Sequence, residues 1–141
     1  FCIRAFEEVS PLPVVNIITE VSQAVAARGL KRLGILGTRT AMETRFYNGI
    51  PTAEVIPPHG PDLDAVHDAY VAMAAAGVIT SAQRTVFESV GAKLIREHGA
   101  EAIMLGGTDL ALAFDESSSP FPILDCAAIH VDAIVSRVKL P

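Results

Sequence analysis

The chain has 141 residues, of which 50% are apolar and 19% charged, and its formal net charge is −5 at neutral pH. This length suffices for one domain with a hydrophobic core, and no apolar run approaches the roughly 18 residues that a membrane-spanning helix requires. The net negative charge and the lack of any Lys/Arg run argue against a nucleic acid as partner. We therefore expect a globular chain that binds neither a bilayer nor a polyanion.

The chain contains two cysteines, Cys2 and Cys126, which form no Cys-x-x-Cys pair. Two cysteines cannot build a disulfide framework, and no group of Cys and His has the spacing of metal ligands. We therefore predict no metal site and a reduced, cytoplasmic setting. His59, His67 and His98 stand beside turns or on polar faces, and we assign them no role in a functional site.

The first third of the chain predicts two helices separated by a short strand. Apolar residues at helical spacing indicate a helix over residues 1–9, which the prolines after it end. The apolar run 14–18 is typical of a short buried strand. Thr19 can cap a second helix, which would end at Gly29.

From residue 30 onwards, short apolar runs alternate with helical segments. Thr80 and Gln83 have the spacing of a capping box, and Gly77 and Gly99 indicate helix ends. In chain order we predict a strand at 33–36, a helix from 39 to about 49, a strand at 53–56, helices at 61–75 and 80–99, a strand at 102–105, a polar loop at 115–119, a strand at 122–124, and a helix at 126–138 that Asp125 caps. This alternation favours an α/β fold, a three-layer sandwich with a mainly parallel sheet.

Two similar turns follow two of the predicted strands. The segment Ile35-Leu36-Gly37-Thr38 is echoed by Met104-Leu105-Gly106-Gly107-Thr108, and open α/β sheets bind ligands beyond the C-terminal ends of their strands. Glycine lets backbone N–H groups approach a ligand, and a helix N-terminus attracts an anion. The turns could hold a carboxylate or a phosphate, or be simple strand-to-helix turns. Neither matches a phosphate-loop or dinucleotide fingerprint, which disfavours a nucleotide.

Three segments, taken in order, resemble the aspartate/glutamate (Asp/Glu/hydantoin) racemase family, and they extend along nearly the whole chain. They are Leu33–Arg39 with Met42-Glu43 and Phe46-Tyr47, then Ala100–Asp109, then Pro122–Asp125 with Ile129-His130. The resemblance implies two similar α/β domains facing each other across a cleft, commonly in a homodimer. It also implies racemisation of an amino acid without pyridoxal phosphate or another cofactor. In that reaction one thiolate removes the α-proton while a thiol on the opposite face returns one.

The resemblance places this chain in the C-terminal part of such a protein. Residues 1–29 resemble the tail of the first domain, 30–121 the second α/β domain, and 122–141 the segment that returns to the first domain. The chain opens at Phe1 in an apolar stretch. We therefore expect an N-terminal domain to precede it as its partner, and this fragment alone to be inactive.

The chain departs from the family pattern at a catalytic position. Where the family usually has Gly-Cys-Thr-Glu, this chain has Gly106-Gly107-Thr108-Asp109. Gly107 thus stands at the place of the second catalytic cysteine and has no side chain to carry a proton. Ala41 also stands where the family often has a threonine that holds a carboxylate.

The candidate site residues follow from the turns and from the resemblance. His130 is the candidate base, one helical turn from Cys126, which could instead be a small buried residue. Asp109 could orient its turn, and Arg39 could pair with a substrate carboxylate or stay solvated. The predicted catalytic positions are Gly107 and His130, and the predicted substrate-binding residues are Thr38, Arg39, Thr40, Gly106, Thr108 and Asp109.

The resemblance therefore implies a cofactor-independent racemase or isomerase that moves the α-proton of a small acidic amino acid such as aspartate or glutamate, or a degenerate form of one. Two alternatives stay open. One is a catalytically inactive, carboxylate-binding relative, which Gly107 and Ala41 favour. The other is a decarboxylase or a relative similar to hydantoin racemase. A flavodoxin-like or response-regulator-like domain lacks support, because neither a phosphate loop nor an acidic cluster for Mg²⁺ accompanies the first strand.

Overall fold

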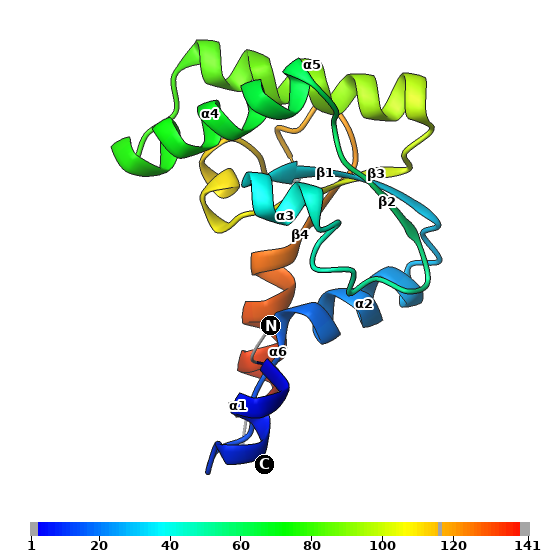
Figure 1. The fold of residues 1–141 in the computed structure, drawn as a ribbon, viewed down its shortest axis with the longest axis vertical. Coiled ribbons are helices and arrows are strands. Elements are labelled where there is room, and N and C mark those ends of the chain that lie inside the picture. Colours follow the sequence, from blue (N-terminus) through cyan, green and yellow to red (C-terminus); the bar gives the residue numbers. More distant parts are fainter. Residues whose placement is uncertain (1–2, 116, 139–141) are drawn as a thin grey trace.

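The computed structural model of the chain describes residues 3–115 and 117–138 (Figure 1). At its centre lies a four-stranded parallel sheet with the strand order β2-β1-β3-β4. The strands are β1 (Arg32–Gly37), β2 (Glu54–Ile56), β3 (Ala102–Gly106) and β4 (Ile123–Asp125). The predicted α/β fold with a parallel sheet is confirmed.

Helices cover both faces of this sheet (Figure 1). In chain order they are α1 (Ile3–Val9), α2 (Ile17–Ala27), α3 (Arg39–Glu43), α4 (Pro61–Ala76), α5 (Ser81–His98), the 3₁₀ helix η1 (Thr108–Leu112) and α6 (Cys126–Val138). α4 and α5 pack together on one face, whereas α2 lies across the other and packs against α6. The short α3 and η1 follow the C-terminal ends of β1 and β3.

The core explains why the central strands are continuous apolar runs in the sequence. Leu33, Ile35 and Leu36 of β1 and Ile103 and Met104 of β3 are buried on both faces of the sheet. A parallel sheet covered by helices on each side has no polar face, so its strands need no alternation.

Capping side chains set the beginnings of two helices as predicted. The Thr80 hydroxyl accepts from the Gln83 amide at 3.2 Å, and the Gln83 side-chain oxygen accepts from the Thr80 amide at 2.8 Å. The Asp125 carboxylate accepts from the Ala128 amide at 2.9 Å. Each bond satisfies an amide at the N-cap or in the first turn that the helix itself leaves without a partner.

The predicted strand at 14–18 is wrong. Val14 and Val15 belong to no regular element, and α2 begins at Ile17. The reason is Asn16, whose side-chain oxygen accepts from the Ile18 amide at 3.0 Å and so caps the helix. Thr19, the predicted cap, lies inside the helix.

The helix predicted from 39 to about 49 ends early, at Glu43. Residues 45–48 then form a left-handed turn, with φ of 51° at Arg45, 56° at Phe46, 59° at Tyr47 and 53° at Asn48. Four consecutive non-glycine residues in this region are strained. The Thr44 hydroxyl holds the turn, donating to the Thr40 carbonyl at 2.6 Å and accepting from the Tyr47 amide at 3.0 Å.

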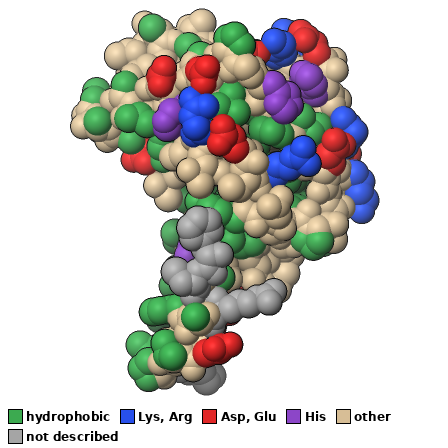
Figure 2. Space-filling view, in the orientation of Figure 1, with side chains coloured by type: hydrophobic (Ala, Val, Ile, Leu, Met, Phe, Trp, Pro, Cys, Tyr) green, Lys and Arg blue, Asp and Glu red, His purple; other side chains and the backbone are tan. Residues whose placement is uncertain are grey.

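α1 and the far end of α6 project away from the sheet and its helices (Figure 1). Apolar side chains are exposed along this projection, and Figure 2 shows hydrophobic groups at its lower end. The exposed apolar residues of α1, of the segment after it and of α6 are Phe6, Val9, Leu12, Val131, Ile134, Val135 and Val138. Among the described residues, no helix combines the length and the apolar character needed to cross a bilayer.

Candidate active site

The two glycine turns lie side by side at the C-terminal edge of the sheet. β1 and β3 pair in parallel, with Gly37 opposite Gly106. A Cβ added at Gly37 would lie 3.0 Å from the carbonyl carbon and oxygen of Gly106, so glycine at 37 favours this close approach of the two turns. The turns therefore meet at the edge where parallel sheets bind ligands.

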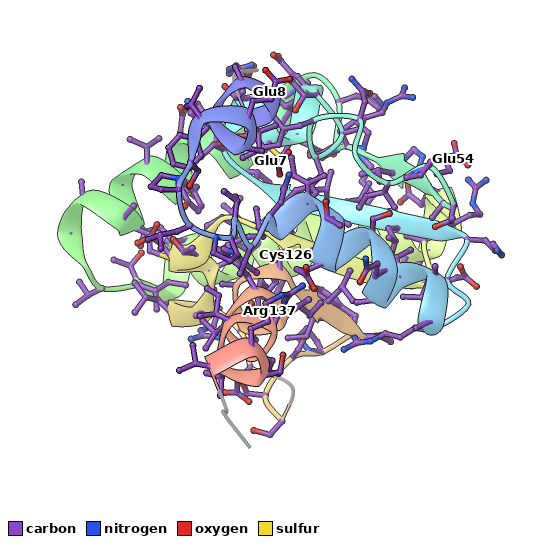
Figure 3. All side chains as sticks on the ribbon, turned by 90° about the horizontal axis from the view of Figure 1, so that it is seen from below. Glu7, Glu8, Glu54, Cys126 and Arg137 are labelled. Atoms are coloured by element: carbon purple, nitrogen blue, oxygen red, sulfur yellow. The ribbon has the colours of Figure 1, made fainter. Side chains whose placement is uncertain are left out.

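A cavity of about 210 Å³ lies beside the second turn. Its walls come from the beginnings of α2 and α6, the left-handed turn, and the end of β3. The lining residues are Ile17, Ile18, Phe46, Tyr47, Leu105, Gly106, Gly107, Thr108, Cys126 and Ala127. We call it the strand-edge cavity. Figure 3 shows Cys126 near the centre of the molecule, at the beginning of α6.

A larger hollow of about 650 Å³ adjoins the strand-edge cavity, because Ile18 and Tyr47 line both. Its other lining residues are Ile3, Thr40, Thr44 and Asn48. Thr40, one of the predicted substrate-binding residues, thus lines this adjoining hollow rather than the strand-edge cavity itself.

Asp109 is held against its own turn by a tyrosine from α4. The Tyr70 hydroxyl donates to the Asp109 carboxylate at 2.7 Å, and the Thr108 hydroxyl donates to the same oxygen at 3.5 Å. Tyr70 is buried. Burial and the hydrogen bond to Asp109 together raise the pKa of Tyr70 to about 12.

The same tyrosine explains the glycine at position 107. Its φ of −154° is extended backbone that any residue adopts, so conformation does not require glycine here. A Cβ added at Gly107 would instead lie 2.5 Å from Cε2 and from the hydroxyl oxygen of Tyr70, and 2.7 Å from Cζ. Tyr70 therefore occupies the space that a side chain at 107 would need.

Thr38 and Arg39 have partners outside the strand-edge cavity. The Thr38 hydroxyl accepts from the Ala41 amide at 3.2 Å and caps α3. The Arg39 guanidinium donates to Asp64 at 2.6 Å and lies 3.5 Å from Glu43. The hydrogen bond to Asp64 is the main cause that raises the pKa of Arg39.

Cys126 and His130 lie one turn apart on α6, but the structure does not join them. Cys126 is buried, and this burial, with a smaller contribution from Asp125, raises the pKa of its thiol. The His130 Nε2 lies 2.8 Å from the Val15 carbonyl oxygen, which ties α6 to the segment before α2. Within residues 3–115 and 117–138, no three His, Cys, Asp or Glu side chains are grouped so that they could hold a metal ion.

The predicted site residues therefore separate into two groups. Gly106, Gly107 and Thr108 line the strand-edge cavity, and Asp109 lies directly behind them. The other predicted residues, Thr38, Arg39, Thr40 and His130, do not line this cavity. The sequence gives no indication of a role for Tyr70, since no spacing rule shows that the ring of a residue on α4 lies against residue 107.

We expect Tyr70 to stay protonated well above pH 10. In a Tyr47→Phe protein it is the one tyrosine left of two, so tyrosinate absorbance reports it alone. Asp109→Asn should lower its pKa from about 12, because the nearby carboxylate no longer opposes the phenolate. The folded chain keeps this proton while an unfolded tyrosine loses it, so stability should fall as pH rises from about 10 to about 12. An unchanged titration in the Asp109→Asn protein would contradict the contact.

Comparison with known proteins decides the family. The sequence pattern of the Asp/Glu/hydantoin racemase family matches residues 2–134. The chain belongs to the Asp/Glu/hydantoin racemase family. The resemblance drawn from its sequence motifs is thereby confirmed.

Solved structures agree with this assignment and show how much of a relative the chain represents. It is similar to a candidate Asp/Glu racemase from Yersinia pestis, with a TM-score of 0.82 and 29% identity over 95% of this chain and 60% of that one. It shares its fold with an aspartate racemase homologue from Pyrococcus horikoshii, with a TM-score of 0.85 and 22% identity over 99% of this chain and 62% of that one. The fold is also similar to that of the aspartate racemase of Picrophilus torridus, with a TM-score of 0.66 and 20% identity over 86% of this chain and 51% of that one. The chain thus spans about three fifths of the first two relatives.

Proposed function

We propose that this chain is part of a cofactor-independent racemase or isomerase that acts on a small acidic amino acid, such as aspartate or glutamate, by proton transfer at the α-carbon. Within that enzyme the chain supplies the wall that holds the substrate carboxylate. The observation that carries the proposal is the glycine turn at the sheet edge, which lines a cavity in a member of this racemase family.

The strand-edge cavity has the backbone groups that suit a carboxylate. Gly106 and Gly107 expose main chain without side chains, and Thr108 adds a hydroxyl donor. Cys126 and Ala127 bring the N-terminal turn of the 13-residue helix α6 to the same cavity. Amides at a helix N-terminus favour an anion, and of those in this turn the Ala128 amide already donates to the Asp125 carboxylate.

Among the described residues, no side chain at the glycine turn is suited to take the α-proton. Gly107 has no side chain, and the raised pKa of the Cys126 thiol makes it a poor source of thiolate. The predicted base His130 has its Nε2 beside the Val15 carbonyl instead. Because inversion needs groups on opposite faces of the α-carbon, we place one proton-transferring group on a facing lobe and keep His130 as the candidate on this chain's side.

The proposed partner of this chain is that facing lobe, the N-terminal domain of the same protein. Residues 30–121 would form the body of the second domain, to whose core and sheet α2 and β4 also contribute, while 1–29 and 122–141 would connect it to the first. The projection of α1 and the end of α6, with its exposed apolar residues, supports this division (Figures 1 and 2). A homodimer and a cytoplasmic setting stay predictions.

Deuterium exchange tests the proposed activity. The whole protein is incubated in D₂O with L-aspartate or L-glutamate, and the α-proton is followed by NMR. We expect loss of the α-proton signal and appearance of the D-enantiomer. Binding without exchange would contradict proton transfer but keep the carboxylate site, and absence of binding would contradict both.

A catalytically inactive binding protein is the second candidate. The contact of Tyr70 with the space around Gly107 favours it, because this turn has no room for a second thiol. In the same experiment such a protein would bind aspartate or glutamate and leave the α-proton in place. A decarboxylase would be recognised by release of CO₂ and a product of single handedness.

A further inference from the structure

Two helices from opposite ends of the chain supply neighbouring walls of the strand-edge cavity. Ile17 and Ile18 come from the beginning of α2, and Cys126 and Ala127 from the beginning of α6. The helices pack against each other, but most of the chain lies between them. The separation of these two walls therefore depends on non-covalent contacts between α2, α6 and the segments next to them.

The contact between His130 and Val15 lies close to both walls. The His130 Nε2 is 2.8 Å from the Val15 carbonyl oxygen, and both residues are half-buried. Val15 comes two positions before Ile17, and His130 comes three positions after Ala127. This one hydrogen bond thus joins the two cavity walls within one helical turn of each.

The acceptor decides which nitrogen of the His130 ring carries the proton. A backbone carbonyl can only accept a hydrogen bond, so the Nε2 must donate. In the neutral imidazole the lone pair is then on Nδ1. Any proton that His130 accepts is therefore taken up at Nδ1, and the bond to Val15 persists in the charged ring.

We propose that His130 is a positioning residue, which holds the beginning of α6 against the beginning of α2 through the bond from its Nε2–H to Val15 and so sets the width of the strand-edge cavity. Without this bond the walls at Ile18 and Ala127 can separate, and a substrate carboxylate held at the glycine turn loses contacts on this side. The inference rests on the proposed function, because the cavity is the proposed substrate site. It gives His130 a part in binding that does not depend on proton transfer.

His130→Gln and His130→Met form a matched pair of variants. Both new side chains are unbranched and have similar helix propensities, but the glutamine amide can donate to the Val15 carbonyl and methionine cannot. Calorimetric titration of the whole protein with L-aspartate should show binding about three- to tenfold weaker for Met, the equivalent of one hydrogen bond. Gln should recover most of this loss. Equal affinities of the two variants would contradict the positioning role.

Two controls separate positioning from general stabilisation. Urea unfolding defines conditions in which each variant is folded, and a contact that only stabilises the fold would leave the affinities of folded Met and Gln proteins equal. Arg137→Gln removes a second contact between these helices, the pair with Glu20 at 2.7 Å, in the last turn of α6. It should retain the wild-type affinity. A loss equal to that of His130→Met would show that any loosening of α6 is sufficient.

The protonated nitrogen of His130 tests the hydrogen bond without a ligand. NMR of the whole protein with ¹⁵N-labelled histidine, assigned by the signal lost in His130→Gln, should show Nε2 protonated and Nδ1 unprotonated in the neutral ring. A proton on Nδ1 instead would overturn the inference and leave the carboxylate site intact. Absence of L-aspartate binding by the wild type would overturn the proposed function and the binding role of His130 together.

Discussion

Gly107→Cys is expected to lower the free energy of unfolding by about 1–3 kcal/mol, the usual range for an overpacked side chain. The extended backbone at 107 accepts any residue, so the loss is steric. The new Cβ would lie 2.5 Å from the Tyr70 ring, which is buried and fixed by Asp109. Urea unfolding of the wild type and the variant measures the difference.

A double-mutant cycle shows whether Tyr70 is the cause. In a Tyr70→Ala background the ring is gone, and Gly107→Cys should be nearly neutral or stabilising, which gives a coupling of about 1–3 kcal/mol. A Tyr70→Phe background is the matched control, because Cε2 and Cζ remain and the loss should persist. Additive effects in the Tyr70→Ala background would show that some other contact forces glycine at 107.

The same contact bears on any attempt to restore a thiol at this turn. A cysteine at 107 fits without displacing its neighbours only if residue 70 becomes smaller, since Tyr70 occupies the space that the new Cβ would need. We therefore expect the effects of substitutions at 107 and at 70 to be coupled. A side chain at 107 would have to displace the Tyr70 ring, so the change of residue at 107 cannot be considered apart from residue 70.

The parts of the fold that the sequence predicted are those with local causes. β1 and β3 are apolar runs long enough to be recognised, and Thr80, Gln83 and Asp125 form the caps that their spacing predicts. The resemblance to the racemase family predicted the order in which these elements follow one another. Each of these signals lies within a few residues of the structure that it specifies.

The errors and omissions have non-local causes. The apolar run 14–18 fits a strand or a helix equally well by periodicity, and one side-chain bond from Asn16 decides for the helix. Contact between Tyr70 and Gly107 joins α4 to the end of β3 across 37 positions, and no spacing rule predicts it. The left-handed turn at 45–48 contains no glycine, so nothing in its composition indicates it.

Phe46→Ala is expected to be the most damaging change at the site, with a loss of about 3–5 kcal/mol in the free energy of unfolding. A left-handed conformation costs about 1–2 kcal/mol for each non-glycine residue, and packing must offset it. Phe46 is the residue of the turn that packs into the core, at 4% exposure. Its removal takes away the main contact that holds the strained backbone.

Tyr47→Ala is the control for this experiment, because it has nearly the same φ, 59° against 56°, but 44% exposure. We expect it to lower stability by no more than about 1 kcal/mol. Since Phe46 and Tyr47 both line the strand-edge cavity, a relaxed turn should also weaken L-aspartate binding under conditions where the Phe46→Ala protein remains folded. Equal stability losses for the two variants would mean that the backbone conformation itself, and not burial of Phe46, maintains the turn and with it one wall of the site.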